Sequence, residues 1–294
     1  MKSTASAMIP VLVCTFAIFL LSAMDAGMKS LVLAVGVYNV VLWRSVLAAG
    51  ASAAGWAARS PSWPGRAALR LHVLRALIVG IILITFFWGL ARLPMAEAIG
   101  LSFIAPLFAL FLAALLLGER IQAQAVWAAV LGVSGVGIIL AGQFGGTAYT
   151  QDTLLGTLSI LVSTVFYGFN LILTRKQAQI ASPIEIMFFQ NLALLIIMGL
   201  AAPWLAVQLP PDYWLPLVGV TALSLSGQYL MSWAYARAEA QYLISTEYSA
   251  FVWAIALGWY YFGESVSWET LAGAALIILS CWIAARASMR PVEG

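Results

Sequence analysis

Residues 94–117 read PMAEAIGLSFIAPLFALFLAALLL, an apolar run with a single charged side chain, Glu97. A helix needs about 20 predominantly apolar residues to cross the hydrocarbon core of a bilayer. The same character extends along the chain, because 63% of the 294 residues are hydrophobic, only 9% are charged, and the mean hydropathy is +0.99. A soluble domain is usually about 45 to 50% apolar and about 25% charged. The sequence therefore predicts an integral membrane protein.

Nine further apolar runs lie on either side of this stretch, and short breaks with turn residues or charges separate them. None of the breaks is long enough for a separate soluble domain. We therefore predict an all-α integral membrane fold with ten transmembrane helices. The predicted ranges are Ile9–Met28, Val37–Gly55, Leu71–Ala91, Pro94–Leu117, Ala123–Ala141, Leu154–Leu173, Pro183–Pro203, Trp214–Ala236, Ala240–Phe262 and Trp268–Ala285.

The remaining composition excludes several classes of function. One histidine, His72, and two cysteines, Cys14 and Cys281, cannot form a disulfide framework or a Cys/His metal site. No P-loop motif is present, and the net charge of +3 comes without a basic cluster, so we expect neither nucleotide hydrolysis nor nucleic-acid binding. We expect no cofactor and no metal, and we place His72 at a solvated helix edge.

Lysine and arginine are distributed unequally between alternate loops. Lys29 and Arg92 fall on one side of the membrane, Arg44 lies inside a span, and the other 11 of the 14 basic residues share the side of the N-terminus. By the positive-inside rule, both termini are predicted to be cytoplasmic.

The chain resembles itself at an offset of 145 residues. FWGLAR at 87–92 matches SWAYAR at 232–237, the pair Gly118 and Glu119 matches Gly263 and Glu264, and Asp25 falls on Asn170. We predict two repeats, residues 1–146 and 147–294, with five helices each. An odd number of helices gives the repeats opposite orientations, the architecture with which many secondary transporters alternate access.

The stretch LARLPMAEAIGLSFIAPLFALFLAALLLGERI at 90–121 and its partner ending YYFGESVSWETLAGAALIIL at 260–279 resemble the EamA domains of the drug/metabolite transporter superfamily. The resemblance covers nearly the whole chain, and within the superfamily it is greatest to the aromatic amino acid exporters of the YddG type. It implies export of amino acids or related metabolites from a bacterial cytoplasm, hence a multi-pass protein of the inner membrane. Val37 and Gln190 depart from the family pattern.

Ionisable groups inside spans are costly and are functional candidates. The planar fork of Arg44 could receive a substrate carboxylate, while Asp25 or Glu247 could face an ammonium group or carry a coupling proton. Alternatively, Arg44 and Asp25 pair to hold two helices together, and Glu97 reaches water. Glu247 has no basic residue at its depth and is the preferred coupling site.

Aromatic and hydroxyl side chains supply further candidates. Four residues of the ninth run recur every three or four positions and would share one face that could line a cavity. Trp88 and Trp233 occupy equivalent positions in the two repeats and could close the two mouths in turn, or they could belong to an interfacial belt. The shared face consists of Tyr242, Thr246, Ser249 and Trp253.

The predicted function is a secondary exporter of amino acids, especially aromatic and other neutral ones, or of related metabolites. The alternatives are a passive channel and, less favoured, an intramembrane enzyme. We expect a cavity between the halves, a small-molecule substrate and the lipid bilayer as partners, and no nucleic acid. Small residues spaced by four on the fifth and tenth runs could support the bundle or contact a second copy in a homodimer.

Overall fold

The computed structural model describes residues 5–58, 63–105, 107, 108, 112, 123–145, 150–235, 237 and 248–288. Over these residues every element is a helix, with ten α-helices and one short 3-10 helix, which confirms the all-α class. The elements are α1 (Ala5–Val35), α2 (Val37–Ala57), α3 (Arg66–Leu90), α4 (Met95–Ser102), α6 (Ala123–Gly145), α7 (Gln151–Ala178), α8 (Pro183–Leu205), η1 (Pro211–Tyr213), α9 (Trp214–Tyr235), α11 (Ser249–Phe262) and α12 (Trp268–Ser288).

Five helices of the described part, namely α1, α2, α3, α7 and α8, are long and apolar enough to cross a membrane. α6, α11 and α12 contain shorter apolar helical stretches. Large apolar side chains such as Leu200, Leu215 and Trp259 are exposed on the outside of the bundle, as expected for a surface that contacts lipid. The full set of ten spans stays a prediction.

The break predicted after Met28 is wrong. α1 continues through Lys29 to Val35, and only Gly36 separates it from α2. Gly36 has a φ of 83°, a left-handed conformation that glycine adopts without a steric penalty. Lys29 therefore lies inside a helix instead of in a loop, and the polar partners described below compensate its burial.

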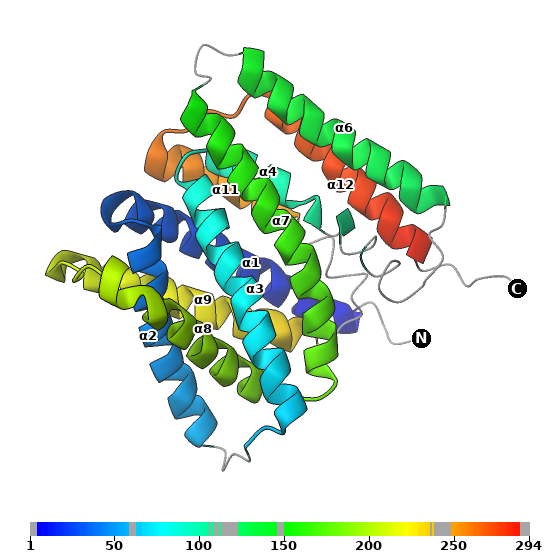
Figure 1. The fold of residues 1–294 in the computed structure, drawn as a ribbon. Coiled ribbons are helices and arrows are strands. Elements are labelled where there is room, and N and C mark those ends of the chain that lie inside the picture. The colour runs from blue at the N-terminus through cyan, green and yellow to red at the C-terminus, as the bar shows by residue number, and fades with distance from the viewer. Residues whose placement is uncertain are drawn as a thin grey trace, which may run out of the picture.

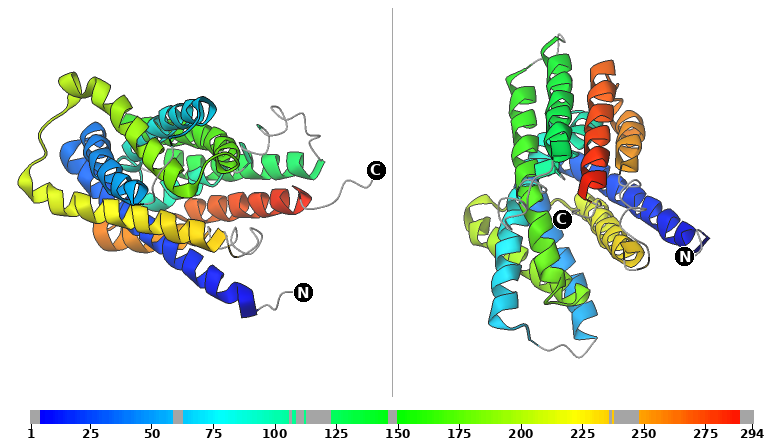
Figure 2. Two further views of the ribbon diagram at one scale, coloured as in Figure 1. Left: turned by 90° about the horizontal axis from the view of Figure 1, so that it is seen from below. Right: turned by 90° about the vertical axis from the view of Figure 1, so that its right-hand side faces the viewer.

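Helices from the two halves of the chain pack together in pairs. α6 and α12 share the most extensive contact and run side by side in Figures 1 and 2. α1 packs along α9 about as extensively as α3 packs along α7, α2 packs against α8, and α4 packs against α11. The first turn of α1 and the last turn of α12 lie on the same side of the molecule (Figure 1).

Glycines bring α6 and α12 together. A Cβ atom added at Gly135 would lie 2.6 Å from the carbonyl oxygen of Gly273, and one added at Gly273 would lie 2.5 Å from that of Gly135. Gly132, on the predicted small-residue stripe, lies against side chains instead: a Cβ atom added there would lie 2.5 Å from Leu107 Cδ1 and 2.9 Å from Ser280 Oγ. These small residues therefore serve packing within the chain.

Candidate functional site

Among the described residues, three groups of polar side chains each join the first half of the chain to the second. The arginine pocket lies between α2, α8 and α9, the lysine cluster joins α1 to the loops around α4 and α11, and the histidine cluster joins α3 to α7 and α8. The arginine pocket consists of Arg44, Ala48, Asn191, Thr221, Ser224, Leu225 and Gln228, the lysine cluster of Lys29, Leu93, Met95 and Glu264, and the histidine cluster of His72, Arg75, Asn170, Gln177 and Glu185.

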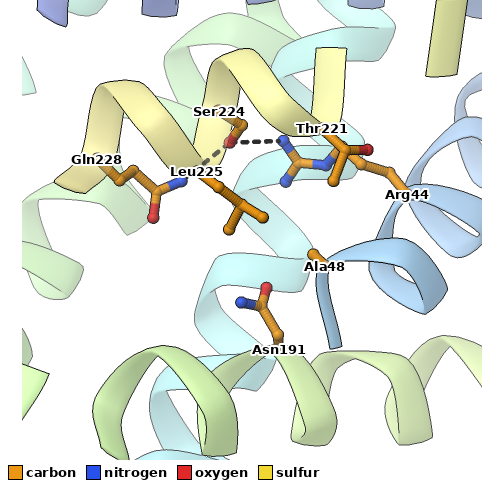
Figure 3. A pocket seen from close by; sticks show the side chains of 7 residues that line it. All are labelled: Arg44, Ala48, Asn191, Thr221, Ser224, Leu225 and Gln228. Atoms are coloured by element: carbon orange, nitrogen blue, oxygen red, sulfur yellow. Dashed lines mark hydrogen bonds between the residues drawn. The ribbon is translucent and has the colours of Figure 1, made fainter. Parts of the chain in front are cut away.

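The arginine pocket is narrow and mostly polar (Figure 3). Arg44 Nη1 donates a hydrogen bond to Ser224 Oγ at 3.4 Å, and Gln228 Nε2 donates to the same oxygen at 2.9 Å. The amide of Asn191 faces this group from α8 (Figure 3). The free volume is about 10 Å³, which is room for about one water. In this state the pocket closes around the guanidinium.

Arg44 is only 9% exposed, yet no carboxylate oxygen of the described residues lies within 4.0 Å of its guanidinium. Its Nε atom is buried and has no hydrogen-bond partner in that part of the chain. Asp25 on α1 is near enough for its charge to act on Arg44, although the two do not form an ion pair at that distance. A buried guanidinium with free donors can bind a carboxylate through two parallel hydrogen bonds.

The lysine cluster is a buried ion pair with additional backbone contacts. Lys29 is 4% exposed, and its Nζ donates to Glu264 and to the carbonyl oxygen of Leu93. The second carboxylate oxygen of Glu264 accepts from the Met95 N–H at 2.7 Å, at the first residue of α4. Gly263, with a φ of 63°, ends α11 and directs Glu264 into this cluster.

The two matched motifs FWGLAR and SWAYAR form the same local structure. The Arg92 guanidinium lies 3.4 Å from the centre of the Trp88 ring and donates to the Trp88 carbonyl oxygen. Arg237 lies 4.1 Å from the Trp233 ring and donates to the Trp233 carbonyl in the same way. Each arginine therefore covers the tryptophan one turn before it near the end of its helix. Closure of the two mouths by Trp88 and Trp233 stays a prediction.

Ser249 and Trp253 lie on α11, one turn apart. Ser249 Oγ and Trp253 Nε1 are buried, and neither has a hydrogen-bond partner among the described residues. Trp253 packs edge-on against Phe19 of α1 at 4.9 Å and belongs, with Trp233, to an apolar cluster around Cys14. The other three ninth-run candidates, Tyr242, Thr246 and Glu247, lie outside the described residues.

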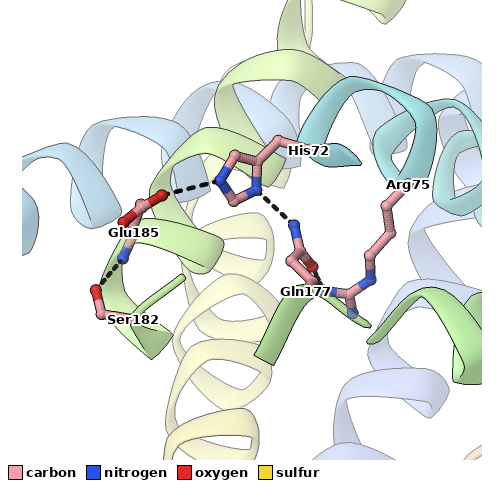
Figure 4. Close-up of polar contacts among 5 residues, drawn as sticks. All are labelled: His72, Arg75, Gln177, Ser182 and Glu185. Carbon is pink, nitrogen blue, oxygen red and sulfur yellow. Dashed lines mark hydrogen bonds and ion pairs between the residues drawn. The ribbon is translucent and has the colours of Figure 1, made fainter. Parts of the chain in front are cut away.

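The histidine cluster was missed in the sequence, and the placement of His72 at a solvated edge is wrong. His72 is fully buried, stacks on Phe189, and lies 3.3 Å from Glu185 Oε1 through Nε2 and beside Gln177 Nε2 through Nδ1 (Figure 4). Its partners are more than 100 residues away in sequence. The local signal was the segment 182–185, where Ser182 caps α8, Pro183 occupies its first turn and Glu185 follows.

Arg75 extends the histidine cluster along α3. Its Nε donates to Asn170 Oδ1 at 2.9 Å, and its Nη1 donates to Gln177 Oε1. Both acceptors belong to α7, so Arg75 connects the two halves of the chain. Asn170 is the residue that matches Asp25 in the repeat, and it accepts a hydrogen bond from an arginine here.

A helical bundle with apolar outer surfaces and polar sites between two halves is typical of a membrane transporter. The chain belongs to the EamA-like transporter family, which matches residues 8–141 and again 154–286. The family therefore occurs as two repeats in this chain, and the resemblance to it in the sequence is confirmed.

Named relatives are transporters as well. The pseudopaline exporter CntI of Pseudomonas aeruginosa (strain UCBPP-PA14) is 26% identical over 218 residues, which cover 74% of this chain and 75% of that protein. A riboflavin transporter of Rhizobium johnstonii is 30% identical over 238 residues, or 80% of this chain and 75% of that one. A crystal structure covering 98% of this chain and 100% of its own has a TM-score of 0.61 at 22% identity, which shows a shared fold. The finer likeness to YddG-type exporters stays a prediction.

Proposed function

We propose that the protein is a secondary transporter that exports amino acids, especially aromatic and other neutral ones, or related metabolites, by alternating access across a bacterial inner membrane. The observation that carries this proposal is Arg44, a buried cation without a carboxylate partner among the described residues. A charge inside a membrane protein is costly unless it is compensated. A substrate carboxylate supplies that compensation.

The ammonium group of an amino acid can bind to Asp25 on α1. Asp25 acts electrostatically on Arg44, has no ion-pair partner within 4.0 Å in the described structure, and is partly exposed, so it can receive an ammonium group. Phe19, which Trp253 contacts, lies six residues before Asp25, or about 9 Å along the helix. The polar atoms of Ser249 and Trp253, which have no hydrogen-bond partner within the described part of the chain, support their role as a wall for the remainder of the solute.

Alternating access is supported by the pairing of helices. α1 with α9 and α7 with α3 are equivalent pairs if residues 1–146 and 147–294 are repeats, and they pack to a similar extent. Five apolar runs in each half would invert the repeats in the membrane. The common side of the first turn of α1 and the last turn of α12 agrees with two cytoplasmic termini. A homodimer remains part of the proposal.

Coupling to protons is assigned to a carboxylate that changes charge during the cycle. Glu247 is the first candidate from the sequence, and Asp25 is the second. In the described structure, Asp25 acts electrostatically on Arg44, whereas Lys29, four residues later, is already neutralised by Glu264. Replacement of each acid by its amide preserves the shape and removes the charge change.

The experiment is saturable uptake of labelled neutral amino acids into proteoliposomes, with and without a pH gradient. Phenylalanine is compared with phenylalanine amide and with phenethylamine, which lack the carboxylate. The proposal predicts saturable uptake that phenylalanine inhibits and the two carboxylate-free analogues do not. Equal inhibition by all three would reject carboxylate recognition, and flux that does not saturate would indicate a channel.

A further inference from the structure

The histidine cluster contains a chain of hydrogen bonds that begins at Arg75. The arginine at this end determines which atom donates and which accepts in each of the other bonds. Arg75 has only donors, so the atom of Gln177 that it contacts is the carbonyl oxygen Oε1. The other amide atom, Nε2, carries two hydrogens and faces His72 Nδ1. His72 Nδ1 must therefore accept, which requires it to be unprotonated.

The opposite ring nitrogen has the complementary role. His72 Nε2 lies 3.3 Å from Glu185 Oε1, and a neutral imidazole with an unprotonated Nδ1 carries its proton on Nε2. The Nε2–H thus donates to the Glu185 carboxylate. In this structure the cluster holds His72 in one neutral tautomer (Figure 4).

We propose that His72 is a proton-binding site between the two halves of the transporter, and that protonation at Nδ1 loosens the end of α7 from α3, where the bonds of Arg75 to Gln177 and Asn170 are kept. A proton on Nδ1 gives an imidazolium, whose new N–H faces the N–H groups of Gln177. The hydrogen bond from Gln177 is lost, whereas the bond from Nε2–H to Glu185 becomes charge-assisted. The contact with α8 is kept and the contact with α7 opens.

The surroundings of His72 make a charged ring dependent on one carboxylate. The ring is fully buried and stacked on Phe189, so a charged imidazole has no water to solvate it and depends on Glu185. The groups that face this region from the packed elements are Glu185 from α8, Arg75 from α3, Gln177, Asn170 and Tyr167 from α7, and the Trp56 ring from α2.

The chain offers a direct measurement because His72 is its only histidine. The intact protein, purified without a histidine tag and labelled with ¹⁵N-histidine, gives one imidazole signal set. In alkaline buffer we expect the shifts of an Nε2–H neutral tautomer, and on acidification those of imidazolium. A neutral Nδ1–H tautomer, or a ring that stays neutral down to the acidic limit, would overturn the proposal.

The opening is tested by measuring the distance between two spin labels with electron spin resonance. The labels are attached at Leu69→Cys on α3 and Ile180→Cys after α7, which are both exposed positions. Cys14 and Cys281 are replaced by alanine. We expect a longer-distance population that grows as pH falls. His72→Gln should abolish this growth, since glutamine can accept and donate but does not take up a proton. Growth unchanged in His72→Gln, or no growth with His72 present, contradicts the proposal.

Ser182→Ala is the matched control, because Ser182 caps α8 next to Glu185 without contacting His72. It should keep the pH response. The role of this site in transport rests on the proposed function, but both measurements use protein without substrate. If amino acid uptake fails but His72 still titrates, the proposed substrate is rejected and the proposed proton-binding site is retained.

Discussion

Arg44 and Lys29 are buried cations with different surroundings. Lys29 has a carboxylate and a backbone carbonyl as partners, whereas Arg44 has a serine hydroxyl, a methionine sulfur and a distant Asp25. The first arrangement is complete without a ligand, and the second is not. This difference is the reason for assigning substrate recognition to Arg44.

Replacement of Arg44 tests that assignment. Arg44→Lys retains the charge but loses the planar fork, so the apparent affinity for a transported amino acid should fall about tenfold or more, and Arg44→Gln should lose more. The measurement is the concentration dependence of uptake in proteoliposomes. Arg70→Gln, at an exposed arginine of α3, is the control. An unchanged affinity in Arg44→Gln would remove this residue from the site.

Replacement of Glu264 tests the structural role of the lysine cluster. Glu264→Gln leaves Lys29 buried without its counter-ion and should destabilise the protein by about 3 kcal/mol. Thermal unfolding in detergent measures this loss. The double variant Lys29→Met with Glu264→Gln should lose less than the sum of the two single changes. Additive losses would show that the two side chains are not coupled.

At the scale of helices, the contact between α6 and α12 depends on a pair of facing glycines. Gly135 and Gly273 each lie against the backbone of the other helix, so neither has space for a methyl group. Gly137, two residues along α6, has no atom within 4 Å of an added Cβ. A methyl group therefore fits at Gly137 of α6 but not at Gly135.

Gly135→Ala should destabilise the protein by about 1 to 3 kcal/mol, because the helices must separate to admit the methyl group. Gly137→Ala should be neutral or stabilising by up to about 1 kcal/mol, since alanine favours helix. Both values come from thermal unfolding in the same detergent. Equal effects of the two substitutions would contradict this packing of α6 on α12.

The sequence predicted the helices more accurately than the contacts between them. Long apolar runs identified the helices, and the predicted end of the ninth run at Phe262 coincides with the end of α11, because these are local signals. The burial of Lys29 within α1 was missed, since its partner Glu264 lies 235 residues away. His72 was misplaced for the same reason, because its partners come from α7 and α8.

At the scale of the whole molecule, all three polar groups lie between the two family repeats. Arg44, Lys29 and His72 come from the first repeat, and the side chains they bond come mostly from the second. Under the proposed alternating access, a movement of one repeat against the other would change all three groups together. The proposed ligand site, the ion pair and the proposed proton site would then depend on one conformational change.

The inverted orientation of the repeats is tested at two equivalent loops. Gly65 before α3 and Gln208 before α9 are both exposed, and they occupy the corresponding connections of the two halves. In cells, a membrane-impermeant thiol reagent should label Gln208→Cys and leave Gly65→Cys unlabelled until the membrane is opened. Labelling of both positions from outside would mean that the repeats have the same orientation.

The central claim is that the protein is a carrier with alternating access, and counterflow tests it most directly. Proteoliposomes preloaded with unlabelled phenylalanine are diluted into a trace of labelled phenylalanine without any ion gradient. A carrier should accumulate the label transiently above its external concentration, and Arg44→Gln should abolish this overshoot. Simple equilibration of the label without an overshoot in the wild type, despite measurable flux, would contradict the account and indicate a channel.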